Sequence, residues 1–284
     1  MKVGLDKGKK NTAWCPFLNQ GGTVVRIMGI LNVTPDSFSD GGNFIDIDKA
    51  VAHAKKMIAD GVDIIDIGGE STRPGATVVT AEKELLRVIP VIKAIRKFSS
   101  IPISIDTYKA EVARLAVAAG ATIINDVGGA KLDPDMPKVM AESGAKIILM
   151  HNRPHGEEVD CFDILKQVKE ELQSSIDLVL TAGVKPENIV IDPGIGFGKT
   201  LQQNIELIRS IDQLQNLGYP VLLAASRKRV IRALVQSDDL VAIEQGTVAV
   251  SCFAYAKGVQ MVRVHDVAAN KMALNVLVGL KEGI

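Results

Sequence analysis

The sequence predicts an α/β protein in which eight parallel strands and their helices form a (β/α)8 barrel. Eight short runs rich in β-branched residues alternate with helical patterns along the chain, which is typical of strand-helix-strand units. The 284 residues are close to the roughly 250 that eight such units need. The glycine-rich turn that marks an open doubly wound sheet is absent after the first run. We therefore expect a TIM barrel with its active site at the carboxyl ends of the strands.

The expected elements follow one another at regular intervals. The predicted strands are 24–31, 62–67, 101–105, 121–124, 145–150, 189–191, 220–225 and 259–264. Apolar residues at helical spacing lie within 50–58, 85–92 and 112–119, so these segments are predicted helices. Six glycines ahead of strands are expected to end helices in a left-handed conformation: Gly61, Gly120, Gly144, Gly183, Gly218 and Gly258. We expect a single domain over 1–284, with 1–22 as an N-terminal extension.

Composition excludes several classes of function. Lysine plus arginine equals aspartate plus glutamate, 33 against 33, so no global field attracts nucleic acid or an anionic membrane. Cys15, Cys161 and Cys252 are odd in number and far apart, which argues against a disulfide framework and a zinc cluster. The first ten residues are too polar for a signal peptide, and no run approaches the length of a membrane span. A cytoplasmic protein is expected.

The first predicted strand ends at Asn32 and leads into an unusually long polar loop. Residues 33–42 precede the next helical pattern, whereas such loops usually have about 2 to 6 residues. Asp36, Phe38 and Asp40 lie on this loop, which suggests a mobile lid. The alternative is an ordinary surface loop rich in turn-forming residues.

Polar residues follow all eight predicted strands. Asp106 and Asp192 come directly after strands that are expected to be buried on both faces, so their carboxylates need hydrogen-bond donors. The ring N–H and amino group of an aminopyrimidine are such donors, and Asn125 can bind the edge of the same heterocycle. For Asp126, Asn152 and Asp266, helix capping or loop anchoring is the favoured interpretation.

A group of cations is expected at the same end of the barrel. Arg263 and His265 are two residues apart on the last strand, so both side chains lean to one face. With Lys228 and Arg73 they would suit phosphate or pyrophosphate, although ion pairing with Asp106 or Asp192 is the alternative. If the ligand is pyrophosphate, Mg2+ is expected with it. Asn32 is then the natural residue to supply an oxygen ligand to the metal, with Asp36 or Asp40 as helpers.

The glycine-rich segment 192–200 resembles a P-loop but is not one. Only three residues separate Gly194 from Gly198, whereas the motif needs four before Gly-Lys-Thr. We therefore expect a close turn of the backbone, with Lys199 solvated at the head of the next helix.

Seven motifs in order along the chain resemble those of the dihydropteroate synthase family of pterin-binding enzymes. They occupy 32–42, 69–75, 104–109, 124–129, 192–199, 226–228 and 262–266. The resemblance implies condensation of 6-hydroxymethyl-7,8-dihydropterin pyrophosphate with para-aminobenzoate, giving 7,8-dihydropteroate and pyrophosphate in folate biosynthesis. It also implies Mg2+, a homodimer and inhibition by sulfonamides. In this family, bond cleavage runs ahead of attack and leaves a cation delocalised into the pterin.

The resemblance also implies roles for individual residues. The pterin would be bound by Asp106, Asn125, Asp192 and Lys228. The pyrophosphate would be bound by Asn32, Thr72, Arg263 and His265, with Asn32 as the metal ligand. The para-aminobenzoate pocket would be formed by Phe38, Arg73, Pro74 and Lys228. The residues expected to be catalytic are Lys228, Asp106, Arg263 and His265.

Some features depart from the family pattern or leave alternatives open. Arg229 stands where serine is frequent, Arg232 where glycine is common, and 153–163 matches poorly. A barrel that transfers methyl groups from methyltetrahydrofolate to a corrinoid protein is the alternative function, and a non-catalytic pterin-binding paralogue is another. The apolar stretch 248–256 is expected either at a dimer interface or inside the monomer.

Overall fold

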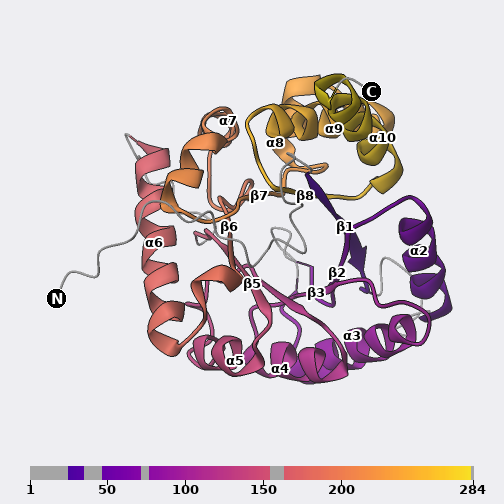
Figure 1. Ribbon diagram of the computed structural model, residues 1–284, viewed down its shortest axis with the longest axis vertical. Coiled ribbons are helices and arrows are strands. Elements are labelled where there is room, and N and C mark those ends of the chain that lie inside the picture. The colour runs from indigo at the N-terminus through magenta and orange to yellow at the C-terminus, as the bar shows by residue number, and fades with distance from the viewer. Residues whose placement is uncertain (1–24, 35–46, 72–76, 154–162, 283–284) are drawn as a thin grey trace.

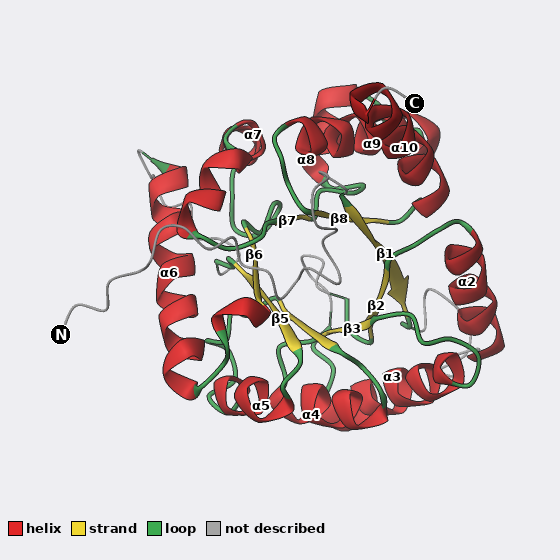
Figure 2. Cartoon of the chain, in the orientation of Figure 1, coloured by secondary structure: helices red, strands yellow, loops and turns green. Residues whose placement is uncertain are grey.

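The strands form a ring with the helices outside it, as Figures 1 and 2 show for this computed structural model. The structure describes residues 25–34, 47–71, 77–153 and 163–282. The strands are β1 (Arg26–Asn32), β2 (Ile64–Gly68), β3 (Ile103–Asp106), β4 (Ile123–Asp126), β5 (Lys146–Met150), β6 (Ile189–Asp192), β7 (Leu222–Leu223) and β8 (Met261–Val264). The α-helices are α2 (Ile47–Ala59), α3 (Ala81–Arg96), α4 (Ala110–Ala119), α5 (Met136–Ser143), α6 (Ile164–Ala182), α7 (Leu201–Arg209), α8 (Arg229–Val235), α9 (Leu240–Ala256) and α10 (Val267–Glu282). Short 3-10 helices are η1 (Pro186–Asn188) and η2 (Ile211–Leu217).

The described part of the chain confirms the predicted barrel and all eight predicted strands. The strands are parallel and lie in the order β6-β5-β4-β3-β2-β1-β8-β7. A bridge between Ile191 and Val221 joins β6 to β7, so the ring is nearly closed. The seventh strand is shorter than predicted, because pairing with β8 covers Leu222 and Leu223 only.

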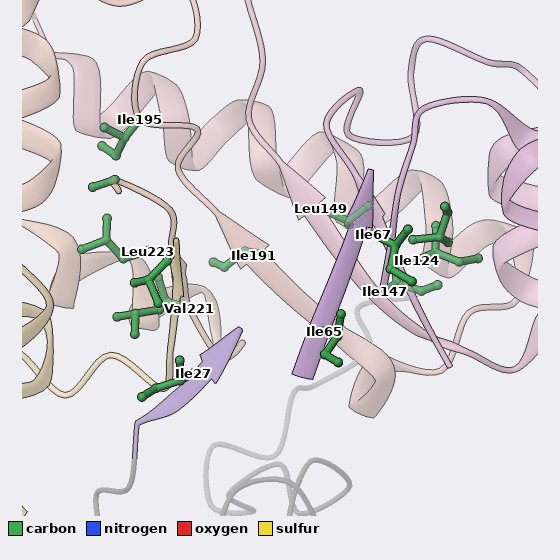
Figure 3. Close-up of a cluster of buried hydrophobic side chains, with 14 of the residues drawn as sticks. Ile27, Ile65, Ile67, Ile124, Ile147, Leu149, Ile191, Ile195, Val221 and Leu223 are labelled. Atoms are coloured by element: carbon green, nitrogen blue, oxygen red, sulfur yellow. The ribbon is translucent and has the colours of Figure 1, made fainter. Parts of the chain in front are cut away.

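Alternation along each strand separates two apolar layers. Ile27, Ile65, Ile124 and Ile191 point outward into the main core beneath the helices, where each is fully buried (Figure 3). A second cluster, on the opposite face of the strands, fills the inside of the barrel: Met28, Ile64, Ile123, Ile148, Val190, Leu222 and Met261. Burial of a side chain of this size contributes about 1.5–3 kcal/mol. The inner cluster is therefore a solid floor beneath whatever lies at the barrel mouth.

The helix ends also agree with the sequence. The three segments with helical spacing are α2, α3 and α4, and all six predicted glycines have positive φ angles. Thr80, Thr200 and Asp239 accept hydrogen bonds from the first turns of α3, α7 and α9. In the described residues, no helix is both long and apolar enough to cross a membrane.

The packing around Gly29 in β1 gives a test of the core. An added Cβ at this residue would lie 2.7 Å from Met57 Sδ and 3.0 Å from methyl groups of Val62 and Val267. We expect Gly29→Ala to lower the free energy of unfolding by about 1–3 kcal/mol through overpacking. Urea unfolding with an unchanged m-value measures this loss.

Gly279 provides the matched control. It lies in α10, and an added Cβ there meets nothing within 4 Å. Gly279→Ala should leave the free energy of unfolding unchanged or raise it by up to about 1 kcal/mol, because alanine favours the helix. Equal urea midpoints for Gly29→Ala and wild type would contradict the packing described here.

Candidate functional site

A polar layer lies directly above the apolar floor of the barrel. In several strands a floor residue is followed two positions later by a polar residue, which therefore faces the same way. The pairs are Ile64 and Asp66, Ile123 and Asn125, Val190 and Asp192, and Met261 and Arg263. In β3, Asp106 stands beside Asn125 of β4 and Gly68 of β2. The carboxyl ends of parallel strands meet at one face, so these side chains converge on the mouth of the barrel.

Arg263 is the centre of this layer. Its Nε donates to Asp66 Oδ2 and its Nη2 donates to Asp106 Oδ2, each at 2.6 Å. Asp66 is fully buried and also accepts from Asn125 Nδ2 at 3.3 Å. Burial lowers the pKa of Arg263, but the two carboxylates raise it more, so the guanidinium stays charged. Ion pairing with Asp106, which was the alternative to anion binding, is thus present in the structure.

Asp66 is the member of the cluster that the sequence analysis missed. Its carboxylate lies within the apolar strand Ile64–Gly68, whose five residues are all buried. A charged residue in such a strand needs a partner, and its two-residue spacing from Ile64 places it on the inner face. That spacing was the signal that would have found it.

Of the two carboxylates predicted from the strand ends, Asp192 is buried and Asp106 is 10% exposed, and both lie at the mouth. Burial raises the pKa of Asp106, although Arg263 opposes the rise, and Asp106 Oδ1 has no hydrogen-bond partner among the described residues. Burial also raises the pKa of Asp192, opposed by Lys228, and Asp192 Oδ1 accepts from Gly194 N at 2.7 Å. A ligand with N–H donors would supply what Asp106 Oδ1 lacks.

Lys228 reaches the same mouth from the turn after β7. Its Nζ donates to Ile195 O at 2.5 Å and lies 4.8 Å from the centre of the Phe197 ring. Burial lowers the pKa of Lys228 to about 8, while Asp192 opposes the shift. The preceding Arg227 has a φ of 57°, a left-handed conformation that is strained for arginine. An ion pair with Glu244 of α9 holds Arg227 in place.

The sequence prediction for Lys199 was wrong. The side chain is not solvated, since Nζ donates to Gly194 O at 2.9 Å and to Phe197 O at 3.0 Å. Burial lowers the pKa of Lys199 to about 7. Gly194 has a φ of 66°, and a Cβ there would stand 1.8 Å from His151 O. The turn after Asp192 is therefore packed against β5 and braced from inside by Lys199.

His265 is oriented by a hydroxyl group of the β7 turn. Ser226 Oγ lies 2.9 Å from His265 Nδ1 and accepts from the His265 backbone N–H at 3.2 Å. The anchoring roles favoured for Asp126 and Asp266 are confirmed. Asp126 accepts from the backbone of Gly128 and Ala130, and Asp266 accepts from the first turn of α10.

Asn32 ends β1 close to Asp106. A Cβ at Gly68 of the neighbouring strand would lie 3.7 Å from Asn32 Oδ1 and 3.6 Å from Asp106 Cβ, so Gly68 lies in contact distance of both side chains. Within the described residues, no group of three or more His, Cys, Asp or Glu side chains could hold a metal ion. The single amide oxygen of Asn32 fits Mg2+ only if phosphate oxygens and water supply most of the ion's ligands.

Comparison with known proteins decides the family. The sequence profile of the family described as pterin binding enzyme matches residues 28–265, which includes the whole polar layer. The chain belongs to this family. A dihydropteroate synthase from Bacillus subtilis is 54% identical over 243 residues, which are 85% of this chain and 83% of that one.

Solved structures of pterin-binding enzymes agree with this assignment. The chain is similar to a Clostridium difficile dihydropteroate synthase determined in the presence of pteroic acid, with a TM-score of 0.86, 47% identity and coverage of 92% of this chain and 97% of that one. It is also similar to a Xanthomonas albilineans dihydropteroate synthase with 4-aminobenzoic acid, with a TM-score of 0.86, 43% identity and coverage of 90% and 93%.

Several predicted residues of this pterin-binding enzyme lie outside the described residues. They are Asp36, Phe38, Asp40, Thr72, Arg73 and Pro74, together with the extension 1–22 and most of 153–163. The two departures from the family pattern, Arg229 and Arg232, are exposed on α8, where Arg232 pairs with Asp238.

The buried lysines of this pterin-binding enzyme give a direct test of the site's electrostatics. Burial disfavours their charged forms, so Lys199 should titrate near pH 7 and Lys228 near pH 8, below the ordinary value of about 10.4. NMR of 13C-dimethylated lysines measures both pKa values, with Lys199→Arg and Lys228→Arg to assign the signals.

The shifted pKa values of the two lysines should also make the free energy of unfolding depend on pH. The unfolded chain keeps these protons up to about pH 10, so it binds more protons than the native state between the two pKa values. The contribution of both lysines to the free energy of unfolding should therefore rise with pH from about 7 to 10. Titration of both lysines above pH 10 in the native protein would contradict the burial described here.

Proposed function

We propose that the chain is a dihydropteroate synthase, which joins 6-hydroxymethyl-7,8-dihydropterin pyrophosphate to para-aminobenzoate in folate biosynthesis. The observation that carries this is the convergence of Asp106, Asn125, Asp192 and Lys228 on one barrel mouth. The relatives described above are synthases of this name, and their chains align with most of this one.

The pterin is the ligand that best satisfies the buried carboxylates. In this proposal, Asp192 accepts from the ring N–H and amino group of the pyrimidine edge, and Asp106 accepts through its unpartnered Oδ1. Asn125 contacts the heterocycle from β4, and Lys228 donates from the opposite side of the mouth. The apolar floor beneath excludes water from the bound ring.

The pyrophosphate leaving group would be bound by cations and polar groups at the rim. In this proposal, Arg263 of β8 and His265, which follows that strand, bind it together with Asn32 and Thr72. When bound, Mg2+ would neutralise phosphate charge, and Asn32 would be its protein ligand. The protein supplies positioning and charge, and none of the proposed roles requires a protein nucleophile.

The reaction then proceeds by displacement at the exocyclic methylene carbon of the pterin. The C–O bond to pyrophosphate breaks, and its electron pair leaves with the pyrophosphate. The cation is delocalised into the pterin, and the amine of para-aminobenzoate forms the new C–N bond and loses a proton. Arg263 and His265 stabilise the charge that develops on the leaving oxygen. Phe38, Arg73 and Pro74 would form the aromatic pocket with Lys228.

We extend the proposal to a homodimer, a single domain over 1–284 and a cytoplasmic location. Large apolar side chains are exposed on neighbouring helices α8, α9 and α10: Leu234, Leu240, Val241, Phe253, Met272, Val276 and Leu280. The stretch 248–256 was expected either at a dimer interface or inside the monomer. It has residues of both kinds, since Phe253 is exposed whereas Ala254 and Tyr255 are buried. An apolar surface of this kind supports self-association.

Lys228→Ala tests the proposed activity. Wild-type protein with dihydropterin pyrophosphate, para-aminobenzoate and Mg2+ should release pyrophosphate and form dihydropteroate, and the variant should lose about 100-fold or more in turnover. Coupled pyrophosphate release measures both. Lys166→Ala is the matched control, because Lys166 is an exposed lysine on α6. A sulfonamide should compete with para-aminobenzoate in the wild-type reaction.

Two other results would contradict the proposed activity or the proposed aromatic pocket. Pterin binding without pyrophosphate release would favour the corrinoid methyltransferase or the non-catalytic paralogue. Full turnover at saturating sulfonamide and limiting para-aminobenzoate would contradict the proposed aromatic pocket.

A further inference from the structure

The amine of Lys199 lies inside the turn that follows β6, and none of the roles above uses it. Its Nζ donates to Gly194 O at 2.9 Å and to Phe197 O at 3.0 Å. Burial lowers the pKa of Lys199 to about 7, so the uncharged amine is present at neutral pH. An uncharged amine has two N–H groups, which matches these two carbonyl acceptors.

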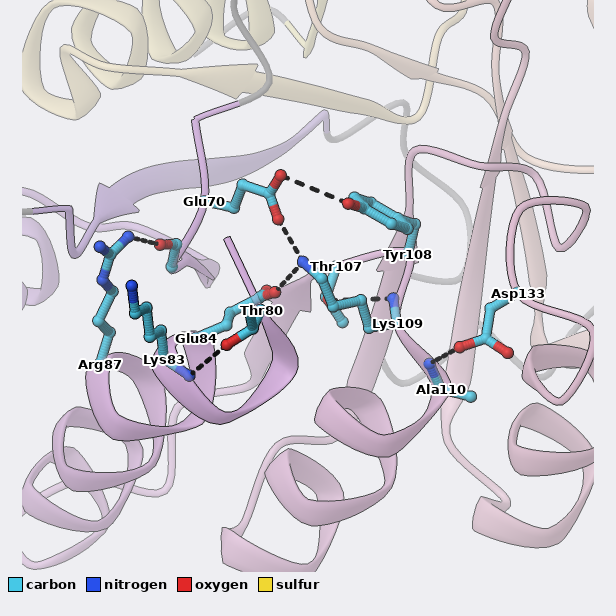
Figure 4. A network of polar contacts seen from close by, with 11 residues as sticks. Glu70, Thr80, Lys83, Glu84, Arg87, Thr107, Tyr108, Lys109, Ala110 and Asp133 are labelled. Carbon is cyan, nitrogen blue, oxygen red and sulfur yellow. Dashed lines mark hydrogen bonds and ion pairs between the residues drawn. The ribbon is translucent and has the colours of Figure 1, made fainter. Parts of the chain in front are cut away.

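A second buried lysine near the barrel mouth has partners of a different kind. Lys109, directly before α4, pairs with the carboxylates of Glu70 and Glu84 (Figure 4). In the described part of the chain, no carboxylate forms an ion pair with Lys199, and its hydrogen bonds go to backbone carbonyl groups. Lys109 therefore neutralises charge, whereas Lys199 fixes the path of the backbone.

The turn that Lys199 holds is the surface along which Lys228 lies. Lys228 Nζ donates to Ile195 O at 2.5 Å and lies 4.8 Å from the centre of the Phe197 ring. A Cβ at Gly196 would lie 3.2 Å from Lys228 Cδ, so the stem of this side chain passes close to the turn. These contacts fall at residues 195–197, and the carbonyl groups that accept from Lys199 belong to residues 194 and 197.

The backbone of this turn needs such a brace. Gly194, Gly196 and Gly198 all have positive φ angles, and glycine is the residue with the greatest freedom to leave any one conformation. Asn204 of α7 holds the middle of the turn, because its Oδ1 accepts from Gly196 N at 2.7 Å. Lys199 ties the beginning of the turn to its end, since one amine bonds to both carbonyl groups.

We propose that Lys199 is a positioning residue that holds turn 194–197 and thereby places the amine of Lys228 for binding of the pterin substrate, an inference that rests on the proposed function. Lys199 itself makes no contact with the substrate in this proposal, because its amine points to the carbonyl groups of the turn. Loss of the Lys199 amine should therefore act on pterin binding through Lys228.

Lys199→Met tests this role, because it keeps an apolar stem and removes the donor. We expect the Kd of dihydropterin pyrophosphate, measured by calorimetry without para-aminobenzoate, to rise roughly tenfold. In a Lys228→Ala background the same substitution should change the Kd by less than about twofold, because the residue through which Lys199 acts is missing. Lys138→Met replaces an exposed lysine of α5 and should leave the Kd unchanged.

The titration of Lys228 gives a readout that a general loss of stability would not change. In Lys199→Met the released turn should expose the Lys228 amine, so its pKa should rise from about 8 toward the ordinary value of about 10.4. NMR of lysine labelled with 13C at Cε measures this pKa and leaves the amines unmodified.

Two further variants complete the test. Lys199→Arg should recover most of the lost affinity, because a guanidinium can donate to both carbonyl groups. Thermal unfolding identifies any variant that fails to fold. If Lys199→Met is one of these, Lys199→Gln takes its place, because its shorter side chain cannot reach both acceptors.

The failures of the two proposals are distinguishable. Wild-type protein that forms no dihydropteroate would overturn the proposed function and this role with it. Wild-type turnover combined with an unchanged Kd for the pterin, or an unchanged pKa of Lys228, in Lys199→Met would overturn the positioning role alone. Equal losses of affinity in the wild-type and Lys228→Ala backgrounds would do the same, because Lys199 would then act without Lys228.

Discussion

Arg263 lies between two carboxylates, and the barrel mouth is organised around that arrangement. Asp66 and Asp106 come from adjacent strands, and each accepts a short hydrogen bond from the guanidinium. Neither a carboxylate nor a guanidinium is stable alone at this depth, so the positions of the three side chains depend on one another. Asn125 is drawn into the same group through Asp66. The polar layer is therefore fixed before any ligand arrives, which favours binding without reorganisation.

The two-residue repeat of the strands makes this layer possible. The same faces that bear Ile64, Ile123, Val190 and Met261 in the floor bear the polar groups one step closer to the mouth. The floor lowers the local polarity and raises the pKa of the carboxylates above it. The connection between β7 and α8 adds Lys228 to this polar layer. In the proposed function, rigid strands hold the groups that bind the pterin, and the connections carry the contacts to the second substrate.

The sequence was sufficient for the barrel and for most of the polar layer, because both follow from local patterns. Strand ends in a parallel barrel meet at one face, so Asp106, Asn125, Asp192 and Arg263 could be placed together without coordinates. Pairings between distant segments could not be derived in this way. Asp66 and Arg263 are 197 residues apart in the chain, and the burial of Lys199 depends on how its turn packs against β5. The roles of the site residues stay predictions.

A double-mutant cycle on ligand binding tests the central place of Arg263 most directly. The Kd of dihydropterin pyrophosphate would be measured for wild type, Asp66→Asn, Arg263→Gln and the double variant, after each is shown to unfold cooperatively. If Asp66 acts by holding Arg263, Asp66→Asn should weaken binding roughly tenfold in the wild-type background and have almost no effect in the Arg263→Gln background. Equal losses in both backgrounds would show that the two residues act independently and would contradict this account.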